Sequence, residues 1–162
     1  MPPNRRPKAR NADDGLLDDT NRRLLAELQQ DARLTIAELG RRVGLSSPAV
    51  ADRVQRLERS GVIRGYRAEL DPRALGLSLT AIVRIRPAPG QLKNVAELAQ
   101  RTPEVVECHR ITGEDCFFAT AHVRDVEHLE ELIDHFVALG QTTTSIMQSS
   151  PVRGRGVDLR PR

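Results

Sequence analysis

The stretch from Ser46 to Arg59 carries hydrogen-bonding side chains that share one face of a helix. If Val50 marks the centre of the apolar side, Asp52 and Gln55 fall on the opposite side at about 100° per residue. Amide and guanidinium groups can form paired hydrogen bonds with base edges, and hydroxyl groups can contact phosphates. The sequence therefore predicts a DNA-contacting face whose candidate residues are Ser46, Ser47, Pro48, Ala51, Asp52, Gln55, Arg56 and Arg59.

The residues around this face have the start and stop signals of two short helices joined by a tight turn. Thr35 begins a capping box, and Gly44 suits the left-handed residue that ends a helix. We expect Ser47 to cap the second helix, with Pro48 at its first helical position and Gly61 at its end. Apolar residues at helical spacing predict one buried stripe on each helix, formed by Ile36, Leu39 and Val43 and by Val50, Val54 and Leu57.

Two helices of this length, joined by a turn of about three to four residues, form a helix-turn-helix. In that motif the second helix enters the DNA major groove. A preceding helix from Asp18 to Gln30, with Leu24, Leu25 and Leu28 on its buried side, would complete a three-helix domain. The alternative is an ordinary helical hairpin whose polar outer face is solvated.

The segment after Gly61 favours extended structure and ends at Asp71 and Pro72, a turn signal. It is either the wing of a winged helix domain or a strand that leads to a second domain. Arg64 and Arg67 within it either touch phosphates or lie exposed on a connector.

From Leu77 onwards the apolar pattern alternates between strands and helices in the order β-α-β-β-α-β. This order is the ferredoxin-like arrangement, one antiparallel sheet with two helices on one face. The other face is expected to be apolar and to need a cover. A second copy of the chain would supply it, so we expect a homodimer. The predicted fold class is α+β, an N-terminal three-helix winged or helix-turn-helix domain followed by a ferredoxin-like βαββαβ domain. Its strands are expected at 77–86, 105–112, 116–123 and 142–150. Its helices are expected at 92–101 and between 125 and 140, with Asp125 as the cap of the second helix and Gly140 as its end.

The composition favours a DNA-binding protein over a membrane or secreted one. The 162 residues include 25 basic and 22 acidic side chains, and their net charge of +3 weakly favours a polyanionic partner. No apolar run approaches the roughly 18 residues of a membrane span. The basic N-terminal residues lack the apolar stretch of a secretory signal. Cys108 and Cys116 are expected to be reduced thiols, so we predict a cytoplasmic location.

The histidines are too dispersed to predict a catalytic or metal site. His128 and His135 share one face of a predicted helix but are about two turns apart, too far for one metal ion. His109 and His122 could approach each other across paired strands, although a surface or sheet position is the simpler interpretation. We therefore expect no enzyme activity, no metal and no cofactor.

The chain resembles the leucine-responsive regulator/AsnC family of transcription factors, also called feast/famine regulators. The resemblance runs from about Leu17 to Val152, and its most specific part extends from Gly44 to Tyr66. It is carried by the segments LDDTNRRLLAELQQDAR, GLSSPAVADRVQRLERSGVIRGYRAELDP, RITGED and QTTTSIMQS. The resemblance implies a DNA-binding domain followed by a ligand-sensing domain, assembly into dimers and often octamers, and a response to an amino acid or a related small metabolite.

The resemblance also implies an effector site at the loop between the second and third strands, where dimers meet. An amino acid needs N–H groups for its carboxylate and an acidic group for its ammonium. Family members that respond to amino acids often have an acidic residue three positions after the loop glycine, where this chain has Cys116. Either the effector therefore differs or Asp115 faces away from it. The alternatives are that Cys116 has ended amino-acid sensing and that the loop is a tight turn with solvated acids. The candidate effector residues are Thr112, Gly113, Glu114 and Asp115.

These features predict a sequence-specific DNA-binding transcriptional regulator. The alternatives are an enzyme that resembles the haem-pathway decarboxylases of similar architecture and an architectural DNA-binding protein with no effector. The predicted organisation is a disordered basic arm at 1–15, a helix-turn-helix domain at 16–61, an extended linker at 62–76, a ferredoxin-like ligand-sensing and dimerisation domain at 77–150, and a flexible basic tail at 151–162.

Overall fold

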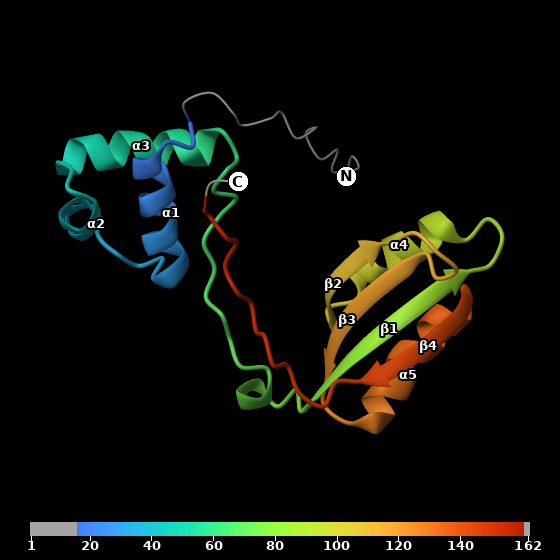
Figure 1. Ribbon diagram of the computed structural model, residues 1–162. Helices are drawn as coiled ribbons and strands as arrows, with labels where there is room; N and C mark the ends of the chain where they lie inside the picture. Colours follow the sequence, from blue (N-terminus) through green and yellow to red (C-terminus); the bar gives the residue numbers. More distant parts are fainter. Residues whose placement is uncertain (1–15, 161–162) are drawn as a thin grey trace. The chain divides into compact units, whose positions relative to one another are not determined.

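A computed structural model describes residues 16–160 (Figure 1). The chain divides into two compact units. The helical unit comprises residues 16–68 together with residues 154–160, and the sheet unit comprises Glu69–Arg153. The basic arm predicted at 1–15 lies outside the described residues.

The helical unit contains three helices in the predicted order: α1 (Asp19–Gln30), α2 (Ile36–Val43) and α3 (Ser47–Arg59). The predicted start and end of α2 are confirmed. The Thr35 hydroxyl accepts a hydrogen bond from the Glu38 N–H at 3.2 Å, and Gly44 is left-handed with φ 76°. The buried residues that join the three helices are Leu24, Leu39, Val43, Val50 and Val54.

The prediction that Ser47 caps α3 is wrong by one residue. Ser46 is the N-cap, with extended backbone angles, and Ser47 is already helical. Pro48 fits in the first turn all the same, because the first N–H groups of a helix have no partner within it. The helix ends at Arg59, and Gly61 follows it with φ 77°.

The segment after α3 is extended, as predicted, but residues 62–72 form no strand, so they make no wing hairpin. Ile63 packs against the helical core, and its N–H donates to the Leu57 carbonyl at 3.0 Å. The Tyr66 hydroxyl donates to Glu58 of α3 at 3.0 Å. Partial burial and the Glu58 carboxylate raise the pKa of Tyr66 to about 12, so the phenol stays a neutral donor.

Residues 156–159 of the basic tail contact α1. The Gln29 side-chain amide donates to the Val157 carbonyl at 3.2 Å and accepts from the Val157 N–H at 2.6 Å. The Arg22 guanidinium donates to the Leu159 carbonyl at 3.0 Å. A Cβ on Gly156 would lie 2.6 Å from the Gln29 amide oxygen, so a glycine lets the tail approach the helix. The expectation of a flexible tail thus does not describe these residues, because they are bonded to residues near the start of the chain.

The sheet unit has the predicted β-α-β-β-α-β order. Its strands pair in the order β2-β3-β1-β4, and all of the pairs are antiparallel. A short 3-10 helix, Arg73–Leu75, precedes the sheet. The elements are β1 (Leu79–Pro87), α4 (Leu92–Arg101), β2 (Val105–Arg110), β3 (Phe117–Val123), α5 (Val126–Val137) and β4 (Gly140–Ile146).

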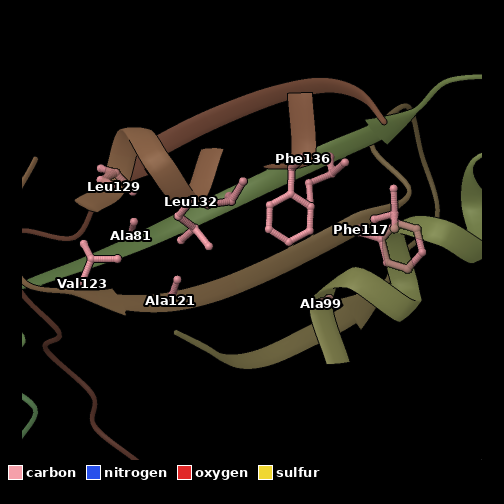
Figure 2. Close-up of a cluster of buried hydrophobic side chains, with 11 residues drawn as sticks. Ala81, Ala99, Phe117, Ala121, Val123, Leu129, Leu132 and Phe136 are labelled. Carbon is pink, nitrogen blue, oxygen red and sulfur yellow. The ribbon is translucent and has the colours of Figure 1, made fainter. Parts of the chain in front are cut away.

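One hydrophobic core lies between the sheet and its two helices. Alternate residues of β1 and β3 face α4 and α5, among them Ala81 and Ala121. Figure 2 shows Leu132 and Phe136, from α5, lying over these strands. Phe136 is completely buried. The helices thus cover one face of the sheet, as in a ferredoxin-like fold.

The sequence predicted that Gly140 ends the second helix of the sheet unit. In the structure Gly140 instead begins β4. The helix ends at Val137, and Gly140 pairs with Pro87 at the end of β1. A Cβ on Gly140 would lie 2.8 Å from the Ala88 backbone nitrogen. The glycine is therefore required by a close approach of two backbones and not by a helix end.

The sheet face away from the helices is more polar than expected. The strand register places Arg84 and Arg86 of β1 on this open face, together with Glu107 and His109 of β2. The large apolar residues that share it are Ile82 and Phe118, both half-buried. The expectation of an apolar open face is therefore wrong, because alternation along these strands places arginines and threonines between the apolar residues.

Candidate nucleic-acid interface and effector loop

The outer face of α3 has the geometry of a recognition surface. The buried side of the helix consists of Val50, Val54 and Leu57. The candidate DNA contacts lie on the other side and are all exposed: Ser46, Ser47, Pro48, Ala51, Asp52, Gln55, Arg56 and Arg59. Asp52 and Arg56 form an ion pair across one turn, with Arg56 Nη2 at 2.6 Å from Asp52 Oδ2.

Arg53 is a structural residue of this interface that the sequence did not reveal. Its guanidinium donates to the Asp18 carboxylate at 2.6 Å and to the Asn21 side-chain oxygen at 3.0 Å. The Arg53 hydrogen bond and the Asn21 N–H lower the pKa of Asp18 from its ordinary value. Arg53 thus holds α3 against the start of α1. The available sequence signal was its place beside the buried stripe, next to Val54.

Gly40 is a second residue that the sequence did not single out. The Gly40 carbonyl accepts hydrogen bonds from the N–H groups of Gly44 at 2.8 Å and of Leu45 at 2.9 Å. A Cβ on Gly40 would lie 2.6 Å from the Leu45 carbonyl oxygen. The turn between α2 and α3 therefore closes directly over Gly40, and this contact sets the angle at which α3 leaves the turn.

The three arginines of α2 and α3 outside the recognition face, Arg41, Arg42 and Arg53, are all paired with acids. Arg42 contacts Glu27 at 2.7 Å and Glu38 at 3.1 Å, and Arg41 also contacts Glu38. These pairs reduce the positive charge that α2 offers to a phosphate backbone. Of these two helices, α3 would therefore supply most of the charged contacts to DNA, through Arg56 and Arg59, and Arg64 and Arg67 also lie exposed in the segment that follows.

The candidate effector loop joins β2 to β3. It is closed by the Ile111 N–H, which donates to the Cys116 carbonyl at 2.9 Å, and Gly113 has a positive φ of 115°. The two acids of the loop are paired with arginines of β1. Glu114 contacts Arg86 at 2.5 Å, and Asp115 Oδ2 lies 3.8 Å from Arg84 Nη1.

These ion pairs bring positively and negatively charged side chains together at the loop. A ligand carboxylate could take the place of a loop acid on Arg84 or Arg86, and the displaced acid could then bind the ammonium group. The sequence placed the acids in the loop but did not reveal their arginine partners, which come from another strand. Cys116, at the position of the expected acid, has its N–H bonded to the Ile85 carbonyl at 3.0 Å.

The histidines are held in separate places. His128 is buried, and its Nε2 lies 3.1 Å from Glu104 Oε1. His122 Nδ1 lies 3.0 Å from the Thr80 hydroxyl, and His109 lies 3.7 Å from Glu107. Within residues 16–160, no three His, Cys, Asp or Glu side chains are grouped closely enough to hold a metal ion. In the same part of the chain, no helix is both long and apolar enough to cross a membrane.

A helix-turn-helix with an exposed polar second helix, followed by a ferredoxin-like sheet domain, defines a class of DNA-binding transcriptional regulators. Residues 80–157 match the family model described as the Lrp/AsnC ligand binding domain. Residues 17–64 match the model of a winged helix-turn-helix DNA-binding domain.

Similar proteins agree with these matches. The HTH-type transcriptional regulator YezC of Bacillus subtilis, itself uncharacterised, is 41% identical over 134 residues, 83% of this chain and 95% of YezC. The feast or famine regulatory protein Rv3291c of M. tuberculosis, solved with L-methionine, has a TM-score of 0.82 and 35% identity over 87% of this chain and 98% of its own. The regulator NMB0573 of Neisseria meningitidis was also solved with L-Met. It has a TM-score of 0.83 and 26% identity, and the match covers 88% of this chain and 96% of that chain. The chain belongs to the Lrp/AsnC family of transcriptional regulators.

Proposed function

We propose that this regulator recognises its operator through the outer face of α3 and that an amino acid or a related metabolite bound at the β2–β3 loop changes its assembly or DNA affinity. The observation that carries the DNA proposal is the exposed polar face of α3 in a helix-turn-helix. Relatives are named as transcriptional regulators, which favours this function over a decarboxylase-like enzyme. A cytoplasmic location is part of this proposal, and a DNA partner supports it.

Replacing Gln55 or Arg56 with alanine is expected to weaken operator binding by about 1–3 kcal/mol each and to relax preference at one base position. Each side chain is exposed on the face proposed to enter the groove. Fluorescence anisotropy with an operator duplex at fixed salt measures the change. Gln100→Ala, an exposed glutamine of α4, is the matched control and should bind like the unmodified chain. Unchanged affinity in both α3 variants would rule out this face.

A free amino acid is expected to bind at the β2–β3 loop and to shift assembly or DNA affinity with a coupling of about 1–3 kcal/mol. The loop offers two acid–arginine pairs, and two relatives were solved with L-methionine. Calorimetry with each proteinogenic amino acid, on the chain alone and with operator, measures binding and coupling. Gly113→Arg and Asp115→Ala should abolish binding.

Gly90→Arg provides the control for this test, because Gly90 also has a positive φ in an exposed turn of the same unit. Binding that survives in both loop variants would place the site elsewhere. No binding below about 1 mM for any amino acid would favour the architectural alternative, a DNA-binding protein without such an effector.

The open sheet face is expected to pair with its copy in a two-fold homodimer, and the resemblance implies further assembly up to an octamer. Ile82 and Phe118 are the apolar residues available for this contact. Light scattering at micromolar concentration should give at least a dimer, and Phe118→Glu should shift the protein towards monomer. A monomeric unmodified chain would contradict the proposal. A two-fold dimer also implies operator half-sites with pseudo-palindromic sequence.

A further inference from the structure

The Asp52–Arg56 ion pair is an unusual feature of a surface proposed to meet a polyanion. Both side chains are well exposed, at 63% and 59% of their full area. An exposed ion pair across one helical turn contributes only about 0.3–0.5 kcal/mol to stability. A carboxylate on this face would also repel DNA phosphates. Stability and general DNA affinity therefore do not explain why an acid lies here.

The geometry of the pair offers another role. Asp52 Oδ2 accepts a hydrogen bond from Arg56 Nη2 at 2.6 Å. The guanidinium has five N–H donors, and this contact uses one of them. The donors that point away from Asp52 keep the fork geometry that matches two acceptors at once. Guanine presents two such acceptors, O6 and N7, in the major groove, whereas adenine presents one acceptor beside an amino donor.

The contact with Asp52 increases the preference of the Arg56 guanidinium for guanine over adenine. A free arginine can turn its side chain towards a phosphate or another base, so it tolerates a wrong base pair. An arginine oriented by a neighbouring carboxylate keeps only the hydrogen bond to N7 when adenine replaces guanine, because its second donor then meets the adenine amino group. Turning to another acceptor would break its contact with Asp52. The carboxylate also disfavours acceptor groups at the adjacent base edge.

We propose that Asp52 is a specificity-determining residue that positions Arg56 to read one guanine in each operator half-site. This inference rests on the proposed DNA contact by α3 and adds the base that the helix reads. Asp52 acts through Arg56, so its loss changes base preference without removing the positive charge that attracts DNA.

In vitro selection from a random duplex library, followed by sequencing, tests this inference on the full chain. The unmodified chain should select a motif with one strongly preferred guanine per half-site. Arg56→Ala and Arg56→Lys should both lose this preference, because lysine keeps the charge but not the fork. Asp52→Ala should reduce the guanine preference about fivefold or more, while its affinity for non-specific DNA stays equal or rises.

Asp19→Ala is the matched control, because it removes an exposed acid from α1 of the same unit and should leave the motif unchanged. Circular dichroism checks that each variant is folded. An Asp52→Ala motif identical to that of the unmodified chain would overturn this inference alone, as would a motif insensitive to Arg56→Ala. An unmodified chain that selects no motif would overturn the proposed function as well.

Discussion

Replacing Phe136 with alanine is expected to lower the free energy of unfolding of the sheet unit by about 3–5 kcal/mol. The Phe136 side chain is 0% exposed and is the largest fully buried side chain among the described residues. It extends from α5 over the sheet (Figure 2), so its removal leaves a cavity that the surrounding strands cannot easily fill. The loss combines the transfer free energy of the ring with the cost of the cavity.

Hydrogen exchange read by mass spectrometry separates this effect from changes in the helical unit. Peptides from β1 and β3 should exchange faster in Phe136→Ala, and peptides from α2 and α3 should not change. Val137→Ala is the control, because the next residue of α5 is 52% exposed and its truncation should change stability by less than about 0.5 kcal/mol. Equal protection of β1 and β3 in the two variants would contradict this account of the core.

Gly40→Ala is expected to destabilise the helical unit by about 1–3 kcal/mol and to weaken operator binding. Helix propensity alone predicts the opposite sign, because alanine in a helix is favoured over glycine by about 1 kcal/mol. The added Cβ would lie 2.6 Å from the Leu45 carbonyl oxygen, a backbone atom of the turn. The turn has to move, and with it the start of α3 at Ser47.

Urea unfolding followed by tyrosine fluorescence measures the stability change, because Tyr66 is the only tyrosine and belongs to the helical unit. Ala37→Gly, at an exposed position of α2, is the control and should lose about 1 kcal/mol through propensity while operator affinity is kept. A Gly40→Ala variant that is more stable than the unmodified chain would show that the turn does not depend on this contact.

The two units carry different candidate sites. The helical unit presents one polar helix face on a rigid support, because Arg53 and Gly40 fix α3 to α1 and to α2. The sheet unit offers an acid–arginine loop and a mixed open face. The proposed coupling between effector and operator requires that the ligand binds the two proposed assembly states with different affinity.

Local sequence patterns determined the elements of both units. The Thr35 cap and the left-handed Gly44 are short-range signals, and the structure confirms both. The second half of the predicted capping box is not formed, because the Glu38 carboxylate contacts Arg41 and Arg42. Apolar residues at helical spacing predicted α1, α2 and α3, and alternation predicted the four strands and their ferredoxin-like order. Such signals can be recognised in the sequence because their physical causes act over only a few residues. These causes are hydrogen bonds within a turn and the burial of one face of an element.

Only the tertiary structure shows which residues position the candidate DNA-contacting helix and the candidate effector loop. Arg53 reaches Asp18, and Arg84 lies beside Asp115, each across more than 30 positions of the chain. Gln29 binds the tail at Val157, 128 positions away. Contacts of this kind depend on the path of the backbone in space, and they leave no period or spacing in the sequence. Gly140 is another example. Its position in the sequence predicted a helix end, but the structure shows that it allows the close approach of β4 to β1.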